Sequence, residues 1–162
     1  MKLACKLGWL LSLALAIGLA AMSYTFLIKG ATEPHADGRT VVLLAADERN
    51  KVLGEMRGLL ETVQAITLAA VDGDMETVQT LASASGMAAA RGESASIISK
   101  LPLSFKKLGL GTHQAFDELA TLATVTSDPL DILREMGAVM GNCTSCHAGY
   151  RLGIEGADRE QP

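Results

Sequence analysis

The chain has 162 residues, enough for one compact domain and an appendage, with 14 basic and 18 acidic side chains. Residues 1–29 contain three of the basic side chains and none of the acidic ones, so residues 30–162 carry a formal charge of −7. This charge excludes nucleic acid as a partner and makes anionic lipid a poor one, because both repel an acidic surface.

An uncharged run of 22 residues extends from Leu7 to Ile28 between two lysines. As a helix this run is roughly 33 Å long, which is enough to cross a bilayer. We therefore interpret residues 1–29 as an anchor in a bacterial inner membrane, with the remainder exported to the periplasm. A secretory signal peptide is the alternative, because Ala21-Met22-Ser23 offers small residues for cleavage and would leave a soluble periplasmic protein.

The exported part shows a helical apolar period and no alternating strand pattern. Residues 30–42 contain glycine, proline and charged side chains without a sustained period, which indicates a tether. A first helix is expected at about Leu44 to Val71, and a second, capped by Asp74, continues to about Ala90. The small and polar residues 91–100 indicate a loop.

A third helix is expected to begin near Pro102, and Ser127-Asp128-Pro129 predicts the start of a fourth that reaches about Tyr150. Four helices with mostly short links predict an all-α fold, an antiparallel four-helix bundle over residues 43–152, followed by a polar tail at 153–162. In the fourth helix we expect five residues to face the core: Leu130, Leu133, Met136, Met140 and Cys143.

The fourth helix carries the motif Cys-x-x-Cys-His, formed by Cys143, Cys146 and His147. Positions three and four residues apart lie on one face of a helix, so two thiols and an imidazole project together. Two thiols so spaced can add to the two vinyl groups along one edge of a haem, while the adjacent imidazole reaches the iron. The motif therefore predicts one covalently attached haem c, with His147 as the axial iron ligand.

Three other interpretations of the motif are weaker. A redox-active Cys-x-x-Cys places its nucleophile at a helix N-terminus, where the dipole lowers the thiol pKa, and this pair lies near a predicted C-terminus. A zinc site requires four ligands, and beyond the motif the exported part offers only His35 and His113. A structural disulfide between residues three apart gains little, because the loop it closes is short.

The four-helix pattern with a C-terminal Cys-x-x-Cys-His-x-x-Tyr-Arg resembles the cytochrome c′ family over about residues 43–152. The matching residues are Cys143, Cys146, His147, Tyr150 and Arg151 at the motif, and Arg49, Leu53 and Met56 in the first helix. The resemblance implies a left-turning four-helix bundle with haem near one end, frequent homodimers, and five-coordinate iron in most members. The anchor, the short loop between the second and third helices, and Phe105 with His113 depart from the family pattern and bear on the dimer geometry.

The far side of the iron decides the function, since a sixth protein ligand gives an electron carrier and an open position admits small gases. In the resembled family the first helix covers this side, so Leu53 and Met56 are the candidates. Leu53 would leave the iron open to nitric oxide or carbon monoxide, whereas the Met56 thioether would complete a six-coordinate centre. Both residues also fit simple core packing at helical spacing.

Other candidates have secondary roles. His113 lies beside the inward stripe of the third helix and is a third candidate ligand or a propionate partner, while His35 is expected to be exposed in the tether. Arg151 follows His147 by one helical turn, where it would touch the haem or stabilise the helix C-terminus. Tyr150 is expected to pack on the haem edge, and Arg49 to meet a propionate.

These features predict a membrane-tethered electron carrier that exchanges electrons with redox proteins of the membrane or periplasm. A five-coordinate protein that binds nitric oxide or carbon monoxide is the second hypothesis, and a haem-bearing accessory subunit of a membrane redox complex is the third. Enzymatic turnover is not expected, because the sequence shows no distal acid–base pair of the kind that peroxidase chemistry requires.

Overall fold

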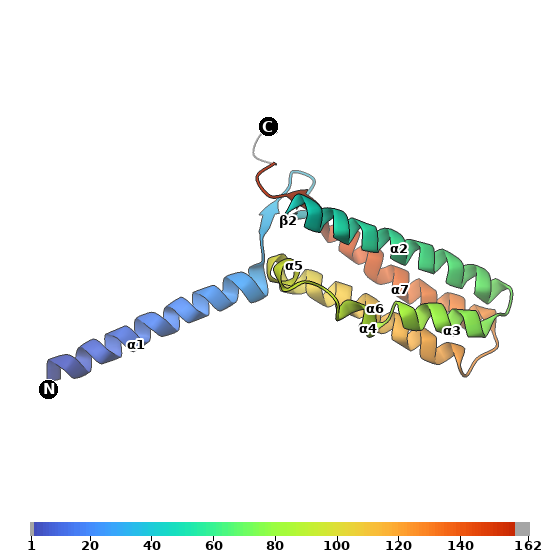
Figure 1. The fold of residues 1–162 in the computed structure, drawn as a ribbon, viewed down its shortest axis with the longest axis horizontal. Helices are drawn as coiled ribbons and strands as arrows, with labels where there is room; N and C mark the ends of the chain where they lie inside the picture. The colour runs from blue at the N-terminus through green and yellow to red at the C-terminus, as the bar shows by residue number, and fades with distance from the viewer. Residues whose placement is uncertain (1, 158–162) are drawn as a thin grey trace.

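The chain is mostly helical, and an apolar N-terminal helix projects from the other elements (Figure 1). The computed structural model describes residues 2–157, with side chains from residue 6 onward. Helix α1 spans Lys2–Ser23, and the π-helical segment η1 continues it over Tyr24–Lys29. The segment Lys6–Lys29 is long and apolar enough to cross a membrane. A secretory signal sequence near the N-terminus has the same properties, so both interpretations of this helix fit the structure.

Four helices pack around a common interior. They are α2 (Ala46–Val71), α3 (Met75–Ala84), α6 (Leu103–Ala123) and α7 (Pro129–Gly149). Helix α2 packs against α3 and α7, and α6 packs against the same two helices, so the four make a closed ring of contacts. The predicted caps are confirmed, because Asp74 accepts a hydrogen bond from the Thr77 N–H at 3.0 Å and Asp128 accepts one from Leu130 at 2.9 Å.

The prediction of a purely all-α fold is wrong, because the structure contains a small three-stranded sheet. Its strands are β1 (Thr32–Pro34), β2 (Thr40–Leu44) and β3 (Tyr150–Ile154), in the order β1-β2-β3. Strand β2 pairs antiparallel with β1 and parallel with β3. The strands were missed because they are short and because successive residues of the central strand, Val41 and Val42, are both buried, which removes the alternating pattern.

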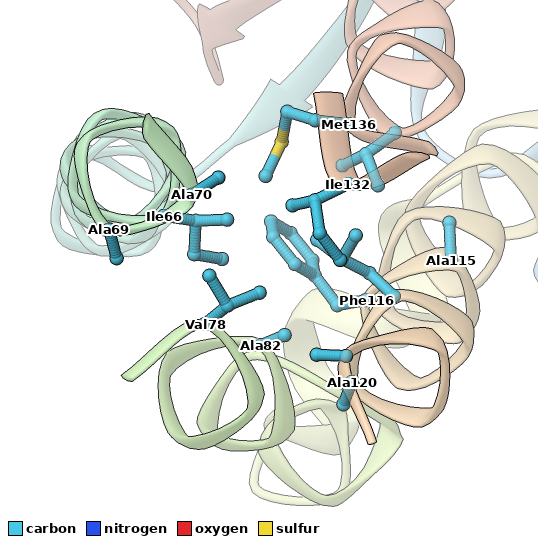
Figure 2. Packing of buried hydrophobic residues seen from close by; sticks show 13 residues of the cluster. Ile66, Ala69, Ala70, Val78, Ala82, Ala115, Phe116, Ala120, Ile132 and Met136 are labelled. Carbon is cyan, nitrogen blue, oxygen red and sulfur yellow. The ribbon is translucent and has the colours of Figure 1, made fainter. Parts of the chain in front are cut away.

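Buried apolar residues form two separate clusters. The larger one lies between α2, α3, α6 and α7 around Phe116, which is 1% exposed (Figure 2). Ile66, Val78 and Met136 surround its ring from three of those helices. The smaller cluster lies where β2 meets the helices, and its buried members are Val42, Leu44, Val52, Ile97, Leu101 and Phe105. The core therefore has one centre near each end of the helices.

The predicted inward face of α7 is partly wrong. Met136 is buried as expected, but Leu130 is 56% exposed and Met140 is 44% exposed. Ile132 and Val139 are buried in their place. Apolar residues occupy more than half of the circumference of this helix, so their period alone does not fix which stripe faces the core.

The predicted second helix is interrupted, and the predicted loop is partly helical. Helix α3 ends at Ala84, a short helix α4 (Met87–Ala90) follows, and α5 covers Ala95–Lys100. The break lies at Gly86, which is buried. There the Asp117 carboxylate of α6 accepts a hydrogen bond from the Met87 N–H at 3.0 Å, and any β-carbon on Gly86 would overlap that carboxylate.

We expect Gly86→Ala to destabilise the protein by about 1–2 kcal/mol, because the added methyl group displaces Asp117 and leaves the Met87 N–H without its acceptor. The measurement is denaturant unfolding of the full chain in detergent. Gly137→Ala is the matched control, since Gly137 lies inside α7 with nothing within 4 Å of an added β-carbon. This control should gain roughly 0.5–1 kcal/mol from helix propensity. Equal effects at the two positions would contradict the assignment.

Candidate functional site

Cys143, Cys146 and His147 lie in the last two turns of α7, which ends at Gly149. Both cysteines are half-buried and neither forms a disulfide, while the His147 side chain is exposed. The Cys143 thiol donates to the Val139 carbonyl at 3.8 Å, one turn earlier in the same helix. Helical spacing thus presents two free thiols and an imidazole near one end of the helix, as the motif predicted.

Cys146 packs against the smaller apolar cluster, together with Met56, Tyr150 and Leu152. This burial raises the pKa of the Cys146 thiol above its ordinary value of 9.0, and the nearby Cys143 thiol adds to the shift. The cause is that an apolar environment disfavours the charged thiolate. Cys146 therefore stays protonated at neutral pH unless it reacts or binds a metal.

Tyr150 fixes the end of the motif to α6. Its backbone N–H donates to the Cys146 carbonyl, and its ring meets the ring of Phe105 edge to face, with centroids 5.3 Å apart and an interplanar angle of 83°. Its hydroxyl also forms a hydrogen bond with the Ser104 hydroxyl. The sequence did not predict Ser104 and Phe105 as site residues, because their role depends on contacts with a residue 46 and 45 positions away.

Three residues of α2 were candidates for the site. Two of them, Arg49 and Met56, form contacts at the end of the protein where the motif lies. Met56 packs against the smaller cluster that Cys146 also contacts, whereas Leu53 is half-buried and belongs to neither cluster of the described residues. The Arg49 guanidinium donates from Nε to the Leu152 carbonyl at 3.3 Å, which holds α2 to β3. The Arg49 side chain therefore helps to attach α2 to the sheet.

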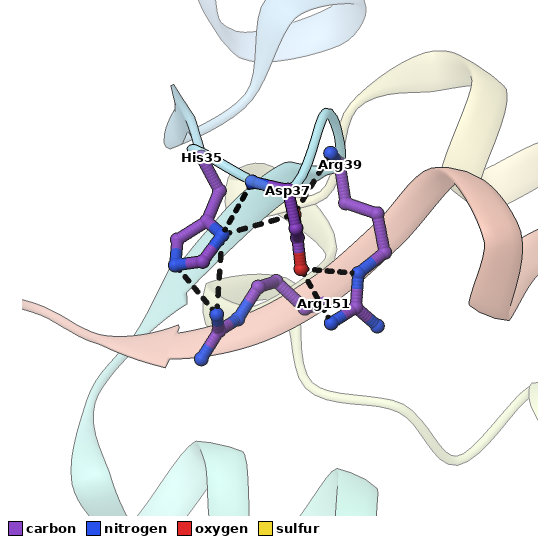
Figure 3. Close-up of polar contacts among 4 residues, drawn as sticks. All are labelled: His35, Asp37, Arg39 and Arg151. Carbon is purple, nitrogen blue, oxygen red and sulfur yellow. Dashed lines mark hydrogen bonds and ion pairs between the residues drawn. The ribbon is translucent and has the colours of Figure 1, made fainter.

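The expected position of Arg151, one helical turn after His147, is wrong, because α7 ends at Gly149 and Arg151 belongs to β3. Its Nη1 donates to His35 Nε2 at 2.6 Å (Figure 3). His35 is exposed as expected, and its Nδ1 lies 2.9 Å from the Asp37 carboxylate. The Arg39 guanidinium lies beside the same carboxylate and, together with the Arg39 backbone N–H and His35, holds the pKa of Asp37 well below its usual range.

His113 is half-buried on α6, where its Nδ1 lies 2.7 Å from the Ser85 carbonyl and donates to it. This contact joins α6 to the end of α3 and gives the imidazole a structural role. Within residues 2–157, no group of three or more His, Cys, Asp or Glu side chains is arranged to hold a metal ion. The candidate site therefore consists of the motif and the apolar cluster beside it.

Comparison with known proteins finds no matching family model, no matching curated protein and no matching solved structure.

We expect alkylation of Cys146 in the chain lacking any attached cofactor to follow a pH profile with its midpoint above 9, because burial raises the thiol pKa and the thiolate is the nucleophile. Peptide mass spectrometry after brief exposure to iodoacetamide measures each cysteine separately. The same chain in concentrated urea is the control, and there the midpoint should fall to the ordinary value. A folded-state midpoint at or below the urea value would contradict the burial of this thiol.

Proposed function

We propose that this protein is a c-type cytochrome that carries one electron on a single haem attached to Cys143 and Cys146. The observation that carries the proposal is the set of two free, half-buried thiols and an exposed imidazole on the last turns of α7. Haem c requires this donor set at this spacing. The apolar cluster beside Cys146 suits a flat apolar ring, so the residues present fit the group.

The fold proposed with this function is the antiparallel four-helix bundle of the cytochrome c′ resemblance, made by α2, α3, α6 and α7. The closed ring of contacts among these helices supports it. A bundle places the motif at the end of its last helix, where a covalently held group can rest against the smaller cluster, to which α2 and α6 contribute. The three-stranded sheet is an addition at that same end, since β3 directly follows α7.

When bound, haem supplies an iron centre that accepts and releases one electron. The chain's own residues would hold that group: Cys143 and Cys146 would bind it through their sulfur atoms, and the exposed His147 imidazole would supply a nitrogen ligand to the iron. Tyr150, held by its contacts with Phe105 and Ser104, attaches the end of α7 to α6 close to the two cysteines.

Met56 is the proposed sixth ligand, which favours electron transfer over gas binding. Of the two α2 candidates, Met56 packs against the cluster that Cys146 contacts and Leu53 belongs to neither cluster. A thioether ligand raises the potential of haem iron and closes the open position. Retention of α1 as a membrane anchor would hold such a carrier close to membrane redox proteins and raise its effective concentration there.

We expect the natively matured protein to carry the mass of one haem, and His147→Ala to keep that mass while losing its low-spin absorption spectrum. The reason is that the thiols make the covalent bonds and the imidazole makes the bond to iron. Intact mass spectrometry and visible spectroscopy measure the two effects. Cys143→Ala with Cys146→Ala is the control that should lose the haem. A parent protein without haem and with both thiols free would overturn the proposed function.

We expect Met56→Leu to lower the reduction potential by on the order of 0.1 V and to open the ferrous protein to carbon monoxide, because the thioether no longer occupies the metal. Redox titration and spectra with and without the gas measure these changes. Met75→Leu is the matched control, since Met75 packs on the other cluster and should leave both properties unchanged. If the parent already binds carbon monoxide, the gas-binding function replaces electron transfer.

A further inference from the structure

The segment between the apolar helix and the domain is held by backbone hydrogen bonds. The Ala31 N–H donates to the Lys100 carbonyl at 2.7 Å, and the Leu43 N–H donates to the Ala31 carbonyl at 2.8 Å. Gly30 has a φ of +66° and lies against the Lys100–Pro102 backbone, so any β-carbon there would overlap it. The predicted tether is therefore a fixed joint, and the end of η1 has a defined position on the domain.

A second contact confines the same joint. Segment η1 packs against α5 and α6, and the Lys106 ammonium donates to the Phe26 carbonyl at 3.5 Å. The first turns of α6 thus lie beside the end of the apolar segment. Figure 1 shows α5, β2 and the start of α2 at this end of the helices, while the turn from α2 to α3 lies at the opposite end.

Charge is distributed unequally along the helices. Residues 58–90 and 113–141, which form the half away from α1, contain nine acidic side chains and one basic side chain, a net charge of −8. Residues 29–57, 91–112 and 142–157, which form the half beside α1, contain ten basic and seven acidic side chains, a net charge of +3. Residues 29–157 therefore have an electric polarity that their net charge of −5 conceals.

Part of the basic half forms a mixed patch next to the joint. Leu103, Lys107 and Leu110 recur at helical spacing on α6, and the two leucines are 39% and 49% exposed. Lys106 and Lys107 form no ion pair with any side chain in the described part of the chain. We call Lys29, Leu103, Lys106, Lys107 and Leu110 the basal patch.

We propose that the basal patch rests on the surface of the bilayer that α1 spans and binds anionic phospholipid headgroups. Its lysines attract the headgroup phosphates, and the exposed leucines reach the boundary with the acyl chains. The acidic half is repelled by the same surface and points away from it. This inference requires α1 to be retained as an anchor, but it does not require haem.

The consequence concerns the Cys-x-x-Cys-His motif, which lies in the half beside α1. With the basal patch on the bilayer, the proposed haem site is held near the membrane surface. Its redox partner is then a protein embedded in the same membrane, whose electron-transfer group lies close to that surface. A soluble protein that approaches from the aqueous side would meet the acidic half first.

The test uses the full, natively matured chain in nanodiscs made from phosphatidylglycerol or from phosphatidylcholine alone. A water-soluble acylating reagent is applied briefly, and peptide mass spectrometry measures the modification of each lysine. We expect acylation of Lys107 to be about fivefold lower in the anionic discs, and Lys106 and Lys29 to change in the same direction. About 0.5 M salt should abolish the difference, because it screens the headgroup charge.

The variant Gln79→Lys supplies a reporter amine on the exposed face of α3, in the acidic half. Its acylation should be equal in both kinds of disc. If Lys107 is acylated to the same extent in the two lipids, whether that extent is high or low, headgroup binding is overturned. Loss of residues 1–29 during maturation, seen in the intact mass, would also overturn it. Neither result affects the haem assignment, which the added mass and the spectrum decide separately.

Discussion

The parallel pairing of β2 with β3 determines the position of the candidate site. Five residue pairs, from Thr40 with Tyr150 to Leu44 with Ile154, join the segment before α2 to the segment after α7. Because Tyr150 lies three residues after His147, this pairing fixes the end of α7 against the beginning of the domain. The motif, the smaller apolar cluster and the joint with η1 are consequently assembled at one end of the protein.

Lys100 connects the parts of this end. Its ammonium forms ion pairs with Glu48 of α2 at 2.7 Å and with Glu155, just after β3, at 2.8 Å, while its carbonyl accepts the Ala31 N–H. The Lys100 ammonium, the Ser96 hydroxyl and the Ala45 N–H lower the pKa of Glu48 to about 2. The Glu48 carboxylate therefore stabilises the fold above its ordinary pKa near 4.5, and that contribution is lost as pH falls toward 2.

The sequence predicts the parts of this protein that depend on local information. The apolar period and the caps at Asp74 and Asp128 correctly locate the long helices, and helical spacing correctly places the motif near the end of α7. Non-local information was missing elsewhere. Strands of three to five residues carry too little pattern to be recognised. Arg151 lies in β3 and not in α7, so it does not occupy the helical position on which its predicted role depended. The net charge of residues 30–162 likewise gives no indication of how acidic and basic residues are distributed along the helices.

The order of the strands has a consequence for biogenesis. The last strand, β3, completes a sheet whose other two strands lie near residues 32–44. A chain that is exported from its N-terminus cannot close this sheet until residue 154 has emerged, and Cys143 and Cys146 emerge before then. During that interval Cys146 is not yet packed against Tyr150 and Leu152. Under the proposed function, attachment of haem would therefore be easiest in this interval, before the sheet closes.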